Sequence, residues 1–311
     1  MGDCKKALAE TNGNIEEAVE IIRKKGQAVA AKRSDREAAE GAVLVKQENG
    51  FSAIIALKCE TDFVAKNEDF VKLAQDILDL AVANKCKSLD EVKALQLGDH
   101  TVADAVTDRS GITGEKMELD GYNFIEGDNV SIYDHMGRHM LCTMVQTNKP
   151  AEEQAHNIAM QVAAMNPVAL NEESVPESVK AEEFKVAIEK TKEEQINKAV
   201  EAAIKKAGFN LYTAESEEHL EEGIMKGHIT AEQADQIREI KKTAAEQKAA
   251  NLPEQMIQNI ANGRMNKFYK ESCLLNQEYI QDSKMSVADY LKAADKELTI
   301  VDFKRFTLRA E

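Results

Sequence analysis

Residues 51–65 read FSAIIALKCETDFVA. The part through Glu60 is apolar and rich in isoleucine and alanine, which predicts a buried β-strand. The Thr61-Asp62 pair then predicts a helix start, because an aspartate there stabilises unpaired backbone N–H groups. Phe63 follows directly, and it either packs onto its own sheet or projects from the surface. A projecting ring beside an acid would suit insertion into another protein, and both alternatives stay open on the sequence alone.

The predicted strand is the second half of a hairpin. Residues 42–47 and 51–59 flank the Asn49-Gly50 pair, which favours a tight turn because both residues tolerate positive φ. A continuous helix is expected to follow, from Asp62 to about Asn84, where apolar side chains recur at helical spacing.

The hairpin pattern occurs a second time along the chain. Val43 to Gly50 aligns with Val130 to Gly137 at an offset of 87 residues. Both copies continue as strand, polar turn and apolar helix, with the second helix expected over residues 154–165. The pattern predicts an α+β fold whose core is a duplicated antiparallel hairpin-plus-helix unit.

Other parts of the chain read as helical. Residues 1–34 predict a small N-terminal helical module, followed by a polar linker at 32–36. Residues 181–250 predict an inserted antiparallel helical hairpin, whose first arm, 181–207, would be about 40 Å long. A final strand is expected over 299–308. The expected domains are the N-terminal module, 1–34; a first core subdomain, 35–129; a second core subdomain, 130–180 with 251–311; and the insertion, 181–250.

Composition narrows the classes of function that the chain can have. The 311 residues are 43% hydrophobic but only 5% aromatic, so the cores must be aliphatic, and the formal charge is −15. Nucleic-acid binding is not expected, since it depends on clustered lysine and arginine. No apolar run is long enough to span a bilayer and no secretory signal is visible, so we expect a cytoplasmic protein without membrane contact. The cysteines are scattered, as in a reducing compartment: Cys4, Cys59, Cys86, Cys142 and Cys273.

The sequence carries little that is typical of catalysis. Neither a G-x-x-x-x-G-K-[ST] loop nor a G-x-G-x-x-G motif occurs, so the chain is not expected to bind nucleotide itself. His135 and His139 beside Asp134 make an incomplete metal pattern, for which surface turn histidines are the alternative. A hydrolase using His135 and Cys142 is the remaining enzymatic hypothesis, but no third group orients them. We therefore expect no enzyme, no catalytic residue, and no bound metal or cofactor.

Several fragments, taken in order, resemble one protein family. They are Asp3-Cys4-Lys5-Lys6-Ala7-Leu8, Asn12-Gly13-Asn14-Ile15-Glu16, Thr61 to Ala65, Ile158-Ala159-Met160 with Val162-Ala163-Ala164 before Pro167, Gly263-Arg264-Met265-Asn266-Lys267-Phe268, and Leu274 to Tyr279. Their order and spacing, nearly end to end, resemble the bacterial translation elongation factor Ts family. These proteins are guanine-nucleotide exchange factors of elongation factor Tu.

The resemblance implies a partner and a site. The partner would be the GTPase elongation factor Tu, whose GDP is exchanged for GTP after its Mg²⁺ is displaced. The segment that dislodges this Mg²⁺ would be Thr61, Asp62, Phe63 and Val64. A loop that presses on the partner's phosphate-binding side would be His135, Met136 and Gly137. The resemblance also implies, less directly, that Asp3 and Lys5 are N-terminal docking contacts with the partner.

The resemblance also implies the nature of the helical parts. Residues 1–34 would belong to a ubiquitin-associated-like (UBA-like) three-helix module. The chain is expected to begin inside it, because the helix before Asp3 is missing and Gly2 stands where a methionine is expected. The insertion would be a coiled-coil protrusion, longer than usual, through which a homodimer is possible. The alternative is a non-enzymatic scaffold or assembly protein that acts through this helical hairpin without a GTPase.

Overall fold

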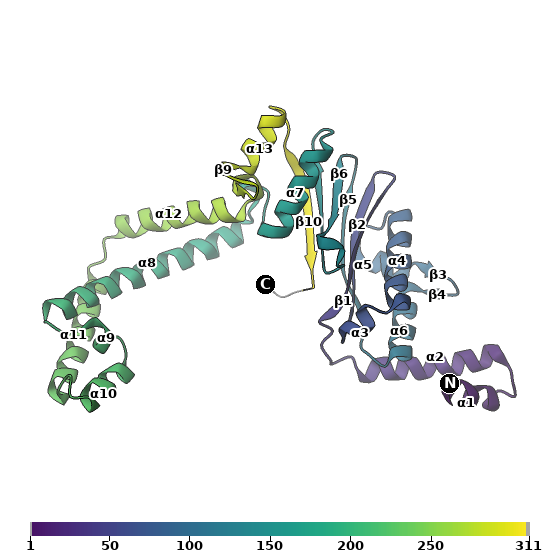
Figure 1. Ribbon diagram of the computed structural model, residues 1–311, viewed down its shortest axis with the longest axis horizontal. Coiled ribbons are helices and arrows are strands. Elements are labelled where there is room, and N and C mark those ends of the chain that lie inside the picture. Colours follow the sequence, from purple (N-terminus) through teal and green to yellow (C-terminus); the bar gives the residue numbers. More distant parts are fainter. Residues whose placement is uncertain (1, 309–311) are drawn as a thin grey trace. The chain divides into compact units, whose positions relative to one another are not determined.

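The computed structural model describes residues 2–308. The chain divides into two compact units, one comprising residues 1–170 with 274–311 and the other comprising residues 171–273. Helices and strands are both present (Figure 1), which confirms the predicted α+β class. Among the described residues, no helix has the length and apolar character needed to cross a bilayer.

The first unit begins with two helices and a three-stranded antiparallel sheet of order β1-β2-β5. These elements are α1 (Gly2–Glu10), α2 (Ile15–Lys32), β1 (Glu40–Glu48), β2 (Phe51–Cys59) and β5 (Glu118–Glu126). Between β2 and β5 lie α3 (Asp62–Ala65), α4 (Glu68–Ala83), α5 (Leu89–Ala94), the paired strands β3 (Gln96–Leu97) and β4 (His100–Thr101), and α6 (Val102–Thr113).

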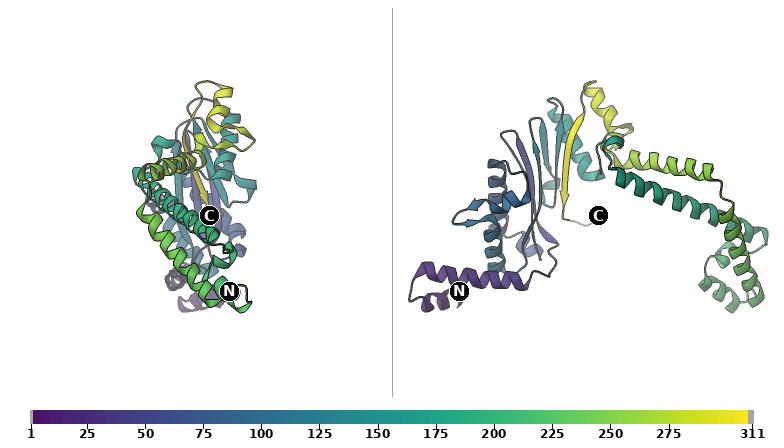
Figure 2. Two further views of the ribbon diagram at one scale, coloured as in Figure 1. Left: turned by 90° about the vertical axis from the view of Figure 1, so that its left-hand side faces the viewer. Right: turned by 180° about the vertical axis from the view of Figure 1, so that it is seen from behind.

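A second three-stranded antiparallel sheet, of order β10-β7-β6, completes this unit. Its strands are β6 (Val130–Asp134), β7 (Leu141–Thr147) and β10 (Ile300–Thr307), the last drawn in yellow at the sheet edge in Figure 2. The remaining elements are η1 (His135–Gly137), α7 (Glu152–Met165), η3 (Leu274–Asn276), the paired strands β8 (Glu278–Tyr279) and β9 (Asp282–Ser286), and α13 (Val287–Ala294).

The first hairpin forms as the sequence predicts. Asn49 and Gly50 have φ of 50° and 70°, which matches the right-handed twist of the flanking strands. The turn sets a register in which Glu48 faces Phe51. The second copy repeats the arrangement, since β6, β7 and α7 correspond to β1, β2 and α4. In each sheet the third strand pairs with the second strand of the hairpin.

The two sheets pack face to face, with helices on both outer sides (Figure 1). The layer between the sheets is built from aliphatic and small side chains, including Val43, Ile54, Ala56, Val130 and Met144. The outer face of the first sheet packs on α4, through residues such as Leu57, Phe70, Ile77 and Leu78. The outer face of the second sheet packs on α7 and α13, through residues such as Val145, Ile158, Val162 and Leu291. β2 is therefore covered on both faces, which explains its continuous apolar sequence.

The structure corrects the helix predicted from Asp62 to Asn84. It contains two helices, because the Asn67 side chain accepts hydrogen bonds from the N–H groups of Asp69 and Phe70. An asparagine that pairs with these otherwise unsatisfied donors starts a new helix. Consequently α3 is a separate one-turn helix with its own direction.

The second unit is entirely helical within residues 171–273. Its elements are η2 (Glu172–Ser174), α8 (Glu177–Lys206), α9 (Leu211–Ala214), α10 (Glu217–Met225), α11 (Ala231–Ala250) and α12 (Glu254–Ser272). The long α8 packs on both α11 and α12, which are separated at Pro253 because proline lacks the N–H that a continuing helix needs. The unit thus extends past residue 250, where the sequence placed its end. The ends of α8 and α11 enclose a small core of their own with α9 and α10, centred on Ile204, Leu220 and Ile237.

Close approach of the two sheets leads to a first prediction. A Cβ atom at Gly121 of β5 would lie 2.5 Å from the Phe306 ring of β10 and 2.7 Å from Ala56. Gly121→Ala should therefore lower the free energy of unfolding by about 1–3 kcal/mol, as overpacking typically does. Urea denaturation measures this change.

The matched control is Gly263→Ala in α12, where no heavy atom lies within 4 Å of the added carbon. Alanine in a helix interior is favoured over glycine, so this variant should be unchanged or more stable by about 0.5–1 kcal/mol. Equal stability of Gly121→Ala and the unmodified protein would contradict the tight packing described for the sheets.

Candidate functional site

The segment after β2 leaves Phe63 on the surface. Thr61 caps α3, its hydroxyl oxygen accepting a hydrogen bond from the Val64 N–H at 3.4 Å. Val64 and Ala65 pack against the core of the first sheet. Because successive helical residues are rotated by about 100°, Phe63 then points away from that core, and 85% of the residue is exposed. The alternative in which Phe63 packs on its own sheet is therefore wrong.

A negatively charged residue, Asp62, precedes Phe63 in the chain. Asp62 accepts a hydrogen bond from Lys66 Nζ at 2.7 Å, with both side chains exposed. This hydrogen bond and the positive charge of Lys66 lower the pKa of the Asp62 carboxyl. Asp62 is thus ionised at neutral pH. An exposed ion pair contributes little stability, so Asp62 can exchange Lys66 for another cation at small cost.

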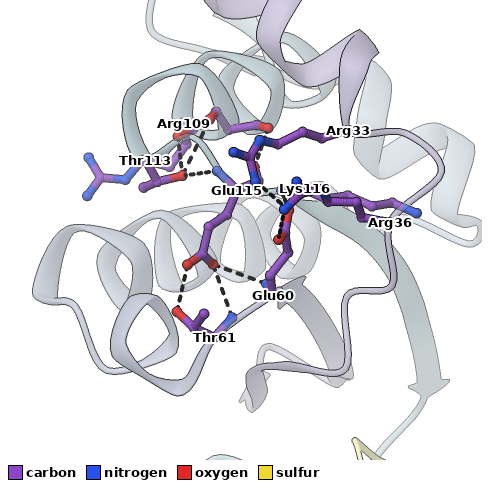
Figure 3. A network of polar contacts seen from close by, with 9 residues as sticks. Arg33, Arg36, Glu60, Thr61, Arg109, Thr113, Glu115 and Lys116 are labelled. Atoms are coloured by element: carbon purple, nitrogen blue, oxygen red, sulfur yellow. Dashed lines mark hydrogen bonds and ion pairs between the residues drawn. The ribbon is translucent and has the colours of Figure 1, made fainter.

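Glu115 fixes the start of this turn (Figure 3). It follows α6, and its carboxylate accepts hydrogen bonds from the N–H groups of Glu60 and Thr61, each at 3.1 Å. The Thr61 hydroxyl donates to the same carboxylate at 2.6 Å. Hydrogen bonds to an ionised acceptor are shorter and stronger than neutral ones. One side chain therefore holds both residues that precede α3.

Glu60 makes the opposite connection. Its carboxylate accepts hydrogen bonds from the Lys116 N–H at 2.7 Å, Arg36 at 3.1 Å and Arg33 at 3.3 Å (Figure 3). The Lys116 N–H, with the two arginines, lowers the pKa of the Glu60 carboxyl. Glu60 and Glu115 thus bind each other's backbone segments, and we call this arrangement the carboxylate clasp.

Sequence reasoning missed the clasp. Its carboxylates lie 55 residues apart in the chain, and Arg33 and Arg36 were assigned to a polar linker. Only the folded structure shows that this linker reaches the end of β2. A glutamate after the Gly114 helix end is a common surface pattern, so no local signal indicated its role.

The second predicted loop is also exposed and tightly bent. Met136 is 65% exposed, and Met136, Gly137 and His139 all have positive φ, between 56° and 61°. Such values are uncommon for methionine and histidine. Asp134 supports the bend by accepting a hydrogen bond from the His139 N–H at 3.1 Å. This contact within the loop supports its bent conformation.

The histidines of this loop have separate partners. His135 Nδ1 lies 3.0 Å from the Tyr133 hydroxyl, whereas His139 Nδ1 pairs with Asp134. Within residues 2–308, no group of three or more metal-binding side chains converges. The hydrolase hypothesis is opposed by the position of Cys142, which is fully buried. Burial raises the pKa of the Cys142 thiol, and a protonated, inaccessible thiol is a poor nucleophile.

The two loops meet at one edge of the first unit. A surface groove is lined by Asp62 and Lys66 from the first loop and by Arg138 and His139 from the second. The Val43 N–H donates to the His139 carbonyl at 2.8 Å, which ties the second loop to β1. The residues that follow the second loop therefore lie near Asp62 and Lys66 of the first.

Asp3 and Lys5 occupy a different position. Both lie on α1, which packs against α2, and Asp3 forms an ion pair with Lys25 of α2. Figure 1 shows α1 next to α2 and apart from α3. Of the predicted loop residues, the groove contains Asp62, next to Arg138 and His139 that follow the second loop, whereas Phe63, His135, Met136, Gly137, Asp3 and Lys5 are not among its lining residues.

Glu60 leads to a second prediction, on pH dependence. Its pKa is lowered from the usual 4.5 in the folded protein, so its stabilising effect is full above about pH 4.5 and is lost as the pH falls through the lowered value. Glu60→Gln should destabilise the protein at pH 7, and the difference from the unmodified protein should shrink toward about pH 3. Urea denaturation across this range measures it.

The matched control is Glu126→Gln at the end of β5, which removes an exposed ion pair with Lys87 of the segment between α4 and α5. Such pairs contribute little, so this variant should follow the unmodified protein at every pH. A Glu60→Gln deficit that stays constant from pH 7 to about pH 3 would contradict the assigned role of the Glu60 charge.

Comparisons with known proteins agree on one family. The family model for Elongation factor TS matches residues 60–216 and 220–310. The chain is 65% identical to the elongation factor Ts of Parabacteroides distasonis and 66% identical to that of Phocaeicola vulgatus, with all of this chain and 94% of each relative aligned. It is 44% identical to that of Porphyromonas gingivalis, with all of this chain and 93% of the relative aligned. The chain therefore belongs to the elongation factor Ts family.

Proposed function

We propose that this chain binds elongation factor Tu loaded with GDP and promotes release of that GDP, so that GTP replaces it. Family membership supports this activity, and the exposure of Phe63 beside an ionised aspartate supports the site. The chain acts by binding a protein and does not make or break covalent bonds itself. Its cytoplasmic location follows from the same activity.

The energetics define what the site must supply. A factor weakens GDP binding by the same ratio by which GDP weakens binding of the factor. Each tenfold change corresponds to about 1.4 kcal/mol. Burial of one phenylalanine in a partner supplies roughly 2–3 kcal/mol. Phe63 loses little packing of its own on insertion, because it is already 85% exposed.

Each loop has a distinct task in this mechanism. A GTPase holds GDP through Mg²⁺ and a loop of backbone amides. Thr61, Asp62, Phe63 and Val64 displace the partner groups that organise Mg²⁺, with the Asp62 charge competing for their cations. His135, Met136 and Gly137 press on the side that binds the phosphates. The groove supports a joint action of the two segments, because it is lined by Asp62 of the first and by Arg138 and His139, which directly follow Gly137 of the second.

The helical parts take supporting roles in the proposal. The α1–α2 pair acts as a UBA-like docking module, in which Lys5 and Asp3 contact the partner and Asp3 exchanges Lys25 for a partner cation. The α8, α11 and α12 helices act as a coiled-coil protrusion, with a homodimer as one possible use.

A scaffold protein that acts through the second unit is the alternative function. Two large exposed side chains at the end of this unit favour it, Tyr212 at 64% and Met225 at 86% exposure. In this alternative, assembly depends on the helical unit and no GTPase is involved.

Phe63→Ala provides the third prediction. It should slow GDP release from elongation factor Tu by roughly 30- to 150-fold, the equivalent of the 2–3 kcal/mol expected from its burial. Stability should not change, since the side chain makes few contacts in the free protein. Release of a fluorescent GDP analogue measures the rate.

The matched control is Tyr212→Ala, which removes an exposed aromatic residue from the second unit. Its release rate should equal that of the unmodified protein. Equal rates for Phe63→Ala and the unmodified protein would refute the role assigned to the ring.

The fourth prediction separates the two functions. Replacing residues 190–245 by a short flexible loop removes the end of the helical unit but retains the part of α8 before residue 190 and all of α12. If the exchange activity resides in the first unit, this variant should release GDP within about threefold of the full chain, a change below 1 kcal/mol. If the variant no longer captures, in a pull-down, the protein that the full chain captures, the scaffold function would be favoured instead.

A further inference from the structure

We propose that Glu115 is a positioning residue, which acts through Thr61 to hold Phe63 in the orientation that enters the partner. This role rests on the proposed function. Glu115 itself is not assigned a contact with the partner or its nucleotide. Its effect on exchange is therefore expected to depend on the presence of the Phe63 ring.

The first argument is how the α3 turn is attached. A helix of four residues is too short to be stable alone, so its direction depends on contacts at its two ends. At its C-terminal end, Val64 and Ala65 pack on the core. At its N-terminal end, the Glu115 carboxylate accepts three hydrogen bonds from Glu60 and Thr61. Phe63 lies between these anchors and has few contacts of its own.

The second argument is that Glu115 is itself held in place. Its N–H donates to Thr113 Oγ1 at 3.3 Å (Figure 3), and its carbonyl accepts a hydrogen bond from the buried Ser110 hydroxyl. Lys116, the next residue, is bound by the Glu60 carboxylate. The carboxylate therefore extends from a rigid backbone.

The third argument concerns the cost of binding. A flexible ring and turn must be ordered when the partner binds, and this lost entropy reduces the net binding free energy. A turn that is already ordered avoids that cost. GDP release is driven only by the difference between the factor's affinities for the empty and the GDP-bound partner. A variant with a loosened turn should therefore promote GDP release from the partner more slowly, even though Phe63 is unchanged.

A double-mutant cycle tests this role with the full chain. Glu115→Ala should slow GDP release about tenfold in the presence of Phe63 but less than about twofold in a Phe63→Ala background, because coupled residues are non-additive. Glu115→Gln, which keeps the size and one oxygen acceptor, should fall between. Glu118→Gln is the control. The Glu118 carboxylate forms an ion pair with Lys116 Nζ at 3.6 Å, and it is not part of the hydrogen bonds that hold Glu60 and Thr61.

A second measurement does not depend on the partner. Amide hydrogen exchange at Glu60 and Thr61 should speed up in Glu115→Ala, while exchange at buried amides of β2 stays unchanged. Faster exchange throughout β2, or equal slowing of GDP release in both Phe63 backgrounds, would show a general structural role and overturn the positioning role.

The outcomes also separate this role from the proposed function. If Phe63→Ala slows release and Glu115→Ala does not, only the positioning role is refuted. If Phe63→Ala itself leaves release unchanged, the proposed site fails and the positioning role fails with it. Unchanged exchange at the Thr61 amide in Glu115→Ala would refute the positioning role alone.

Discussion

Burial of β2 on both faces is the constraint on which the first unit depends. The strand lies between β1 and β5 in its sheet, with α4 on one face and the second sheet on the other. Each fully buried aliphatic or aromatic side chain contributes roughly 1.5–3 kcal/mol, so β2 cannot shift without losing several such contributions. The Thr61 turn leaves the end of this strand. It therefore starts from one of the most firmly fixed parts of the chain.

The apolar core ends where the site begins, and from there charged groups fix the path of the chain. Beyond Cys59 the chain turns to the surface, where apolar packing can no longer fix its path. Glu60 and Glu115 replace it with hydrogen bonds to backbone N–H groups. Two carboxylates in one place would normally repel each other. Here each is compensated separately, Glu60 by two arginines and the Lys116 N–H, and Glu115 by three donors from the turn.

Features that neighbouring residues determine, such as turns and helix starts, can be predicted from the sequence. Features that depend on contacts between distant segments cannot. The Asn49-Gly50 turn and the repeated hairpin could be predicted because neighbouring residues specify them. The break before α4 could also have been read, since Asn67 followed by two acidic residues is typical of a helix start. The clasp could not, because its two glutamates meet only when β2 pairs with β5, and its arginines reach Glu60 only when α2 packs in place. The exposure of Phe63 cannot be predicted from the sequence for a related reason. It depends on whether Phe63 or its neighbours Val64 and Ala65 pack on the core.

The two loops reach rigidity by different means, and this difference follows from their positions. The first loop has polar donors and acceptors from three chain segments within reach, so hydrogen bonds fix it. The second loop closes a hairpin and must reverse direction within a few residues, so backbone geometry fixes it, with Met136 and His139 in a conformation that is costly for their residue types. Asp134 and the Val43–His139 hydrogen bond maintain that conformation. A protein that must deform a tightly bound partner needs loops that resist deformation themselves. Otherwise the energy of contact would be absorbed by the loops and would not reach the ligand that is to be released.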